Sequence, residues 1–157
     1  MSRSPAPQVR WLNDREQAAW RAYIEAATSL IDSLDRQLQL DAGMPHAYYE
    51  ILVRLSESPG HRLRMSELAA ATRSSRSRLS HAVARLEQRG WVQRREYSDD
   101  RRGQVAALTD SGMQVLINAA PGHVGQVRAA LVDVLTAEQL DQLREISQRI
   151  LDHLGAR

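Results

Sequence analysis

The sequence predicts a fold that is mainly α with a small β-hairpin wing, in which long helices occupy both ends of the chain. Apolar residues recur at helical spacing toward both termini, whereas residues 91–96 and 104–108 alternate as strands around a polar turn. A chain of 157 residues can form one domain with a core, or a small domain that carries helical arms. The pattern favours the second arrangement, because the small central unit cannot cover both long helices.

The composition excludes several classes of protein. The chain contains no Cys, which rules out disulfides, thiolate metal sites and thiol redox sensing. No window approaches the run of about 18 apolar residues that a membrane span needs, and the first residues lack the hydrophobic stretch of a signal peptide. The five His residues show no metal-ligand spacing, and no nucleophile elbow, phosphate loop or carboxylate pair is found. We expect a soluble cytoplasmic protein that is not an enzyme and needs no membrane, metal or cofactor.

The N-terminal region is predicted to be a flexible arm followed by a dimerisation helix. Residues 1–12 contain Pro, Ser and Arg without periodicity, which is typical of a flexible arm. Asn13 and Glu16 have the spacing of a capping box, and helical spacing then continues to about residue 40. Such a helix is about 40 Å long, more than a small domain needs for its own core. We assign residues 13–46 to this dimerisation helix and expect it to pack outside its own domain.

The centre of the chain, residues 47–108, is predicted to be a winged helix-turn-helix. Pro45 opens its first helix, and Ser75 and Gly90 are the expected N-cap and C-terminal stop of the helix before the hairpin. The expected elements are a helix ending near residue 57, a turn at 58–60, an extended segment at 62–65, a short helix at 67–71, a helix at 76–89 and the hairpin at 91–108.

The C-terminal region, residues 109–157, is predicted to supply further dimerisation helices. One helix starts after Thr109, and Pro121-Gly122 should kink it or split it in two, because proline removes one backbone hydrogen bond. Thr136 and Gln139 form a second capping box, and apolar residues then follow at helical spacing. Two such helical ends favour a twofold symmetric homodimer over a monomer with a larger core.

Positive charge is concentrated in the centre of the chain. Residues 62–102 contain eleven Arg and five acidic residues, whereas the rest of the chain contains ten Arg and fourteen acidic residues. Such a distribution is typical of a chain whose centre faces a polyanion. A solvated basic surface without a partner is the alternative. Double-stranded DNA is favoured, because the basic residues gather on adjacent parts of the predicted motif.

The helix at 76–89 has the chemistry of a DNA recognition helix. Leu79, Ala82, Val83 and Leu86 form an apolar stripe, and the opposite face is small and polar with Arg at its margins. This suits a helix in the major groove, although an ordinary surface helix would share the same stripe. The expected base-edge contacts lie toward its N-terminal end. The residues expected to contact DNA are Ser75, Arg76, Ser77, Arg78, Ser80, His81 and Arg85.

The hairpin tip is predicted to enter the minor groove. Asp100 and Arg102 project to the same side of an extended segment, so that the carboxylate can hold the guanidinium outstretched. An oriented Arg is what a narrow, electronegative minor groove attracts. Arg94, Arg95 and Arg101 are the further basic residues expected in the wing. The alternative is a surface ion pair worth under about 1 kcal/mol.

Several motifs of this chain resemble those of the MarR family of transcription regulators. They are Leu68-Ala69, Ser75-Arg76-Ser77, LEQRGWV at 86–92, Asp100-Arg101-Arg102 and LTDSG at 108–112. The resemblance runs from about Trp20 to the C-terminus. It implies a homodimer that binds a pseudopalindromic operator, often as a repressor released by a small ligand. It also implies that Asp100 is the wing acid, that Arg102 enters the minor groove and that the major-groove contacts lie within residues 75–85.

The chain departs from the family pattern at two points. Arg73 and Ser74 stand in the turn before the recognition helix, where the family commonly has Gly and an aliphatic residue. The absence of Cys also removes peroxide sensing by thiol chemistry.

Aromatic residues near the first two helices are candidates for an effector pocket. They could bind a small aromatic or phenolic effector where the arms meet the DNA-binding unit, although helical aromatic residues also serve as plain core or interface. His123 is expected to be structural. The candidate pocket residues are Trp20, Tyr23, His46, Tyr48 and Tyr49.

Two other classes of function compete with a DNA-binding regulator. A winged helix can serve as a protein-interaction module, but such a module needs no basic recognition face. An enzyme needs a catalytic motif, and none is found in this sequence. The sequence therefore favours a transcription regulator.

Overall fold

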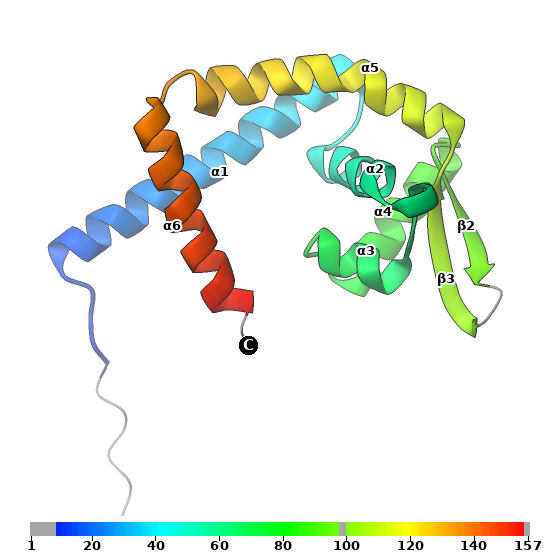
Figure 1. Cartoon of the computed structure of the whole chain (residues 1–157), viewed down its shortest axis with the longest axis horizontal. Helices are drawn as coiled ribbons and strands as arrows, with labels where there is room; N and C mark the ends of the chain where they lie inside the picture. Colours follow the sequence, from blue (N-terminus) through cyan, green and yellow to red (C-terminus); the bar gives the residue numbers. More distant parts are fainter. Residues whose placement is uncertain (1–8, 98–99, 156–157) are drawn as a thin grey trace, which may run out of the picture.

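The computed structural model describes residues 9–97 and 100–155, and the side chains of residues 96–103 are not described. α1 (Asp14–Ala42) and α5 (Asp110–Val127) run along one side of the elongated chain (Figure 1). The smaller central elements lie at one end of this pair, and α6 (Ala137–Gly155) lies toward the other. The central elements are α2 (His46–Glu57), the 3-10 turn Pro59–His61, β1 (Arg62–Arg64), α3 (Met65–Ala71), α4 (Arg76–Gln88), β2 (Val92–Tyr97) and β3 (Asp100–Leu108).

The predicted capping box is present at the start of α1. The Asn13 side chain accepts a hydrogen bond from the backbone N–H of Glu16, and the Glu16 carboxylate accepts one from that of Asn13, both at 2.9 Å. The helix ends before Gly43, whose φ of 63° lies in the left-handed region that glycine favours. The buried residues of α1 are Leu34 and Leu38. Its N-terminal half is largely exposed, in agreement with a helix that extends beyond its own domain.

An apolar core joins the C-terminal end of α1 to the central unit. Leu116 and Ala119 of α5 pack against the same core. Because the core draws on α1 to α5, its burial fixes α4 relative to the long helices. The largest fully buried side chains are Leu38, Met44, Leu52, Leu55, Leu68, Leu79, Val83, Leu86 and Val92.

The described strands form one antiparallel sheet in the order β1-β3-β2. Leu63 of β1 lies opposite Ala106, and Val92 of β2 lies opposite Leu108. The extended segment expected at residues 62–65 is therefore a third strand of the wing. The predicted hairpin is confirmed, with a second strand that starts earlier than expected, at Asp100, and a register shift after Glu96.

Of the two outcomes expected at Pro121, a kink or a split of the helix, the split does not occur. The helix continues through Pro121 to Val127. Packing of α5 on α1 offsets the one backbone hydrogen bond that proline removes, and the Gln126 amide donates to the Ser33 hydroxyl of α1 at 2.8 Å. A π-helical turn, Arg128–Val132, follows α5 and was not predicted.

Capping contacts decide where α3 and α6 begin. α3 starts at Met65 and not at Glu67, because the Glu67 carboxylate accepts a hydrogen bond from the backbone N–H of Arg64 at 3.0 Å. The capping box predicted before α6 is present, since the Thr136 hydroxyl accepts from the N–H of Gln139 at 3.2 Å and the Gln139 side chain accepts from the N–H of Thr136 at 2.9 Å. None of the described helices is long and apolar enough to cross a membrane.

The first turn of α5 lies against the base of the wing at Gly112. A Cβ atom at this position would lie 2.1 Å from the carbonyl oxygen of Trp91. The backbone N–H of Thr109 donates to the same carbonyl at 3.1 Å, and the Thr109 hydroxyl accepts from the N–H of Gly112 at 3.0 Å. No side chain therefore fits at residue 112 unless α5 moves away from the wing.

We expect Gly112→Ala to lower the free energy of unfolding by about 3 kcal/mol, as overpacked sites do. Gly125→Ala is the matched control, because Gly125 lies in the same helix and an added Cβ would meet no atom within 4 Å. Urea unfolding followed by circular dichroism measures both variants. Equal stability of the two variants would contradict the close approach of α5 to Trp91.

Candidate nucleic-acid interface

α3 and α4 are joined by a tight turn. Leu68 and Ala69 of α3 are buried, and the Ala69 carbonyl accepts a hydrogen bond from the N–H of Ser74 at 3.0 Å. Arg73 has a φ of 50°, the left-handed conformation for which glycine is preferred. The turn thus has the backbone shape that a glycine would give, at a cost of about 1 kcal/mol for the Arg side chain.

α4 presents a polar, basic face to solvent. Leu79, Val83 and Leu86 are buried and Ala82 is half-buried, which confirms the predicted apolar stripe. Ser80 is half-buried. The other residues predicted to contact DNA from this helix are exposed, and they are Ser75, Arg76, Ser77, Arg78, His81 and Arg85.

The N-terminal end of α4 is electropositive. The Ser75 side chain caps the helix by accepting a hydrogen bond from the N–H of Arg78 at 3.3 Å. The first turn contains Arg76 and Arg78 and no acidic residue. The helix dipole places partial positive charge at the same end. This end of α4 is therefore suited to binding phosphate groups.

Arg94 and Arg95, both predicted to be wing contacts, differ in their surroundings. Arg94 faces α4, where its Nε donates to the Glu87 carboxylate at 2.7 Å and its Nη2 donates to the Ser80 carbonyl at 3.3 Å. Arg95 is exposed and donates to the Gln93 side chain at 3.2 Å. Arg95 can reach a phosphate, whereas Arg94 is engaged in holding the wing against α4.

The remaining predicted wing contacts are Asp100, Arg101 and Arg102. Their backbone belongs to β3, and their side chains lie outside the part of the chain that the structure describes. Their contacts with DNA remain predictions from the sequence.

Arg89 links the end of α4 to the loop between α1 and α2. Its Nη1 donates to the carbonyl of Gly43 at 2.9 Å. Its guanidinium lies 4.8 Å from the centre of the Trp91 ring and 6.0 Å from that of Tyr48, within the range of cation–π attraction. The sequence did not predict this role of Arg89, because Gly43 and Tyr48 lie more than 40 positions before it in the chain. Trp91 is near in sequence, but it does not indicate the other two contacts.

The predicted effector pocket does not form within a single chain. Trp20 and Tyr23 lie in the exposed half of α1, with 55% and 47% of their surface accessible. His46, Tyr48 and Tyr49 lie in α2, beyond the other end of α1. The two groups are separated by about 30 Å of helix, so they cannot line one cavity in one chain.

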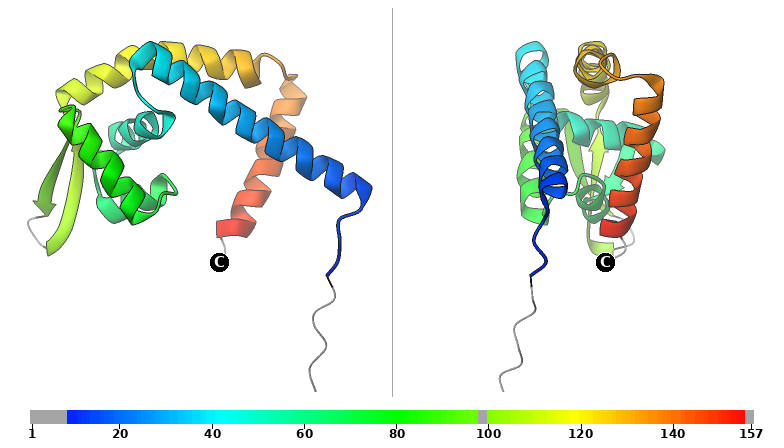
Figure 2. Two further views of the ribbon diagram at one scale, coloured as in Figure 1. Left: turned by 180° about the vertical axis from the view of Figure 1, so that it is seen from behind. Right: turned by 90° about the vertical axis from the view of Figure 1, so that its left-hand side faces the viewer.

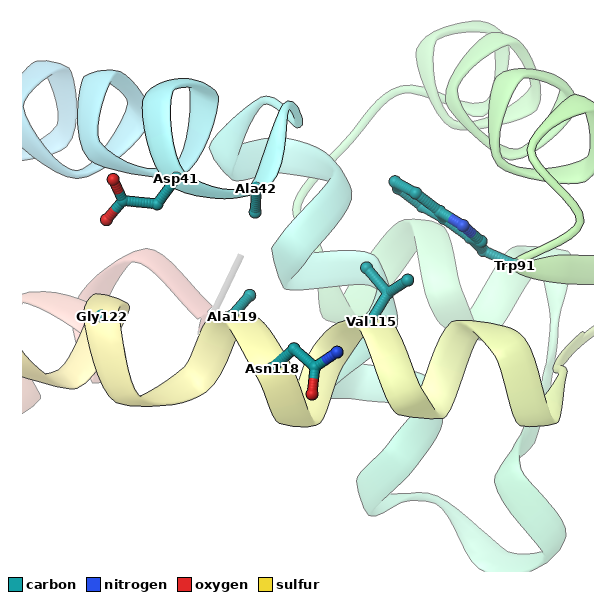
Figure 3. A pocket seen from close by; sticks show the side chains of 7 residues that line it. All are labelled: Asp41, Ala42, Trp91, Val115, Asn118, Ala119 and Gly122. Carbon is teal, nitrogen blue, oxygen red and sulfur yellow. The ribbon is translucent and has the colours of Figure 1, made fainter.

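Two hollows in the surface lie near the two ends of α1. A hollow of about 310 Å³ lies between α5 and the end of α1, where Trp91 and Val115 point toward each other (Figure 3). A second, of about 470 Å³, lies at the start of α1 and includes Trp20. The first is lined by Asp41, Ala42, Trp91, Val115, Asn118, Ala119 and Gly122.

His123 of α5 lies against α2. Its ring centre is 4.4 Å from that of Tyr49 and 5.7 Å from that of His46. Its Nδ1 is buried without a hydrogen-bond partner among the described residues. Burial, and then the charge of nearby His46, lower the pKa of His123 below its ordinary value of 6.5. Within the described residues, no group of side chains could hold a metal ion.

Comparison with known proteins identifies the family. Residues 42–103 match the sequence model described as the MarR family. The crystallised Sco3205, a MarR family transcriptional regulator from Streptomyces coelicolor solved in complex with DNA, is 59% identical to this chain. The match covers 93% of this chain and 92% of Sco3205, with a TM-score of 0.90. The chain belongs to the MarR family.

Other MarR proteins are similar along most of the chain. AbsC, a MarR family regulator from S. coelicolor, is 44% identical over 95% of this chain and all of its own, with a TM-score of 0.89. The transcriptional repressor MprA of Escherichia coli K12 is 28% identical over 85% of this chain and 75% of its own length. Membership of this family confirms the predicted fold class and the prediction of a transcription regulator instead of an enzyme.

Protonation of His123 is expected to weaken folding at mildly acidic pH. Because its pKa in the folded chain lies below the unfolded value of about 6.5, the unfolded chain binds the proton first as the pH falls. The contribution of neutral His123 to the free energy of unfolding is therefore complete above pH 6.5 and decreases as the pH falls below that value. We expect His123→Asn to lower the loss in Tm between about pH 7.5 and pH 5.5 relative to the unchanged protein.

His81→Asn is the control for this measurement, because His81 is exposed on α4. It should leave the loss in Tm unchanged. An equal loss in all three proteins would contradict the assignment to His123.

Proposed function

We propose that this chain binds a pseudopalindromic site in double-stranded DNA as a homodimer and represses transcription until a small ligand releases it. The observation that carries the proposal is the exposed, basic face of α4 beside the wing. Sco3205 was crystallised in complex with DNA. MprA and the Bacillus subtilis protein YetL, which is 28% identical over 57% of this chain, are both named repressors.

In this proposal α4 lies in the major groove. Its small side chains, Ser77 and Ser80, allow the helix to approach the base edges closely, and His81 can donate to or accept from them. Arg76 and Arg78 lie beside the electropositive helix end, where they meet phosphates. The base-reading residues and the phosphate-binding residues then share one exposed surface.

The wing contributes a second contact, in the minor groove. Arg102 is the proposed inserted residue and Asp100 the residue that orients it, as the sequence pattern predicts. Arg95, which is exposed on β2, is the proposed phosphate contact at the side of the wing. In support of this, only Arg89, Gly90 and Trp91 separate α4 from β2, so the wing lies directly beside the recognition helix.

The exposed apolar face of α6 supports a homodimer. α6 has no buried residue and packs extensively on no other described element, and Figures 1 and 2 show it standing apart. A 19-residue helix without packing is marginally stable in water. Its exposed apolar residues are Ile146, Ile150, Leu151 and Leu154.

The start of α1 offers a matching surface at the other end of the chain. Trp20, Tyr23, Ile24 and Ile31 are each at least 40% exposed along this helix. Large exposed apolar surfaces rimmed by polar residues mark interaction sites. We propose that a second copy covers both surfaces by twofold symmetry, which also places two α4 helices for two DNA half-sites.

The releasing ligand is proposed to be a small aromatic or phenolic molecule that binds where the long helices meet the winged unit. The rings of His46, Tyr49 and His123 lie at this junction, and the hollow beside Trp91 opens near it. A regulator with this role acts in the cytoplasm, where a bacterial chromosome lies.

Selection of genomic fragments by the purified protein, followed by footprinting, tests the proposal. We expect two half-sites about 34–36 Å apart, one turn of the double helix. The logarithm of the affinity should fall with the logarithm of salt concentration, with a slope of about −0.9 per neutralised phosphate. A flat salt titration, or binding to a protein partner alone, would exclude a DNA-binding regulator.

Ile150→Glu is expected to break the dimer, because it places a charge in the apolar face of α6. Gln148→Glu, on the opposite side of the same helix, is the matched control. Sedimentation velocity should show a dimer for the unchanged protein and for Gln148→Glu, and dissociated chains for Ile150→Glu. A dimer that persists in Ile150→Glu would remove α6 from the interface.

A further inference from the structure

The polypeptide reverses direction between the recognition helix and the wing. α4 ends at Gln88, and β2 begins at Val92. β2 is an edge strand, because β3 lies between it and β1. Alternate backbone N–H groups of β2 therefore face away from the sheet and need another acceptor.

Glu87, in the last turn of α4, supplies that acceptor. One carboxylate oxygen accepts the backbone N–H of Arg94 at 2.7 Å, and the other accepts the Nε of the same residue at 2.7 Å. Arg94 also donates from Nη2 to the carbonyl of Ser80 at 3.3 Å. These contacts tie the backbone and the side chain of one wing residue to α4.

The geometry makes this tie rigid. Bonds between a carboxylate and a guanidinium are short and directional, and the planar group fixes an angle as well as a distance. The two side chains are partly shielded, with 32% of Glu87 and 24% of Arg94 accessible to solvent, so water competes less than at a surface pair. Arg94 spans two turns of α4, from Glu87 back to Ser80.

We propose that Glu87 and Arg94 are positioning residues for DNA recognition, which set the angle of the wing relative to α4. This inference rests on the proposed function. A recognition helix in one groove and a wing in the next contact DNA together at one relative angle. The Glu87–Arg94 pair holds that angle before DNA is bound. Less free energy is therefore lost in fixing the wing when the complex forms.

The sign of one effect separates this inference from simple electrostatics. Glu87 is an acid beside a surface that faces phosphates, so its loss makes that surface more positive. Electrostatics alone then predicts tighter binding to every DNA. A positioning role predicts weaker binding to the operator and equal or tighter binding to unrelated DNA.

The test compares Glu87→Gln and Arg94→Lys with the unchanged protein on footprinted operator and on an unrelated duplex. We expect both variants to bind the operator about tenfold more weakly, the usual effect of losing a charge-assisted hydrogen bond. Binding to unrelated DNA should be unchanged for Arg94→Lys, which keeps the charge, and equal or tighter for Glu87→Gln. Glu50→Gln is the matched control, because it removes an acid that pairs with Arg54 at 3.9 Å on α2.

A double-mutant cycle with Arg102→Ala separates positioning of the wing from a general structural role, because a general structural role would leave the effects of the two substitutions on operator affinity additive. Arg102→Ala should weaken operator binding strongly in the unchanged protein and by a smaller factor in Glu87→Gln, because a wing that is not held contributes less. The same loss of affinity in both backgrounds would overturn the inference. So would a Glu87→Gln protein that binds the operator as tightly as before, or one that loses operator and unrelated DNA by the same factor. If the unchanged protein binds no duplex, the proposed function itself fails, and this inference with it.

Discussion

Burial of one side of α4 is the interaction on which the rest of the structure depends. Leu79, Val83 and Leu86 are almost completely removed from solvent, each contributing about 2 kcal/mol by the area it buries. Because that side packs in the core, the serines and arginines on the opposite side of the helix face the solvent. The same core includes Leu38 of α1 and Leu116 of α5, so the exposed face of α4 is also held at a fixed orientation to the long helices.

Features that depend on neighbours in sequence could be predicted. The capping box at Asn13, the apolar stripe of α4 and the stop at Gly90 each rest on residues within one or two helical turns. The course of α5 through Pro121 could not be predicted in the same way, because packing on α1 decides it. The pairing of β1 with β3 likewise depends on segments far apart in the chain.

The candidate site shows the same division. The clustering of arginines along the sequence predicted the basic face, but it could not tell which guanidinium groups point inward. Arg94 turns toward α4 because Glu87 accepts from it, and Arg89 turns toward Gly43, which lies 46 positions earlier. The spacing of aromatic residues likewise could not show that the length of α1 keeps Trp20 away from Tyr49 within one chain.

The unpacked state of α6 has a consequence for the life of each new chain. Under the proposed pairing, folding and association are linked by mass action, so stability rises with the amount of protein present. A subunit that has not yet met another displays an apolar arm, which proteases and chaperones recognise. At low concentration, unpaired subunits would be degraded faster than they form dimers. The regulator would then persist only at concentrations at which dimer formation is faster than degradation.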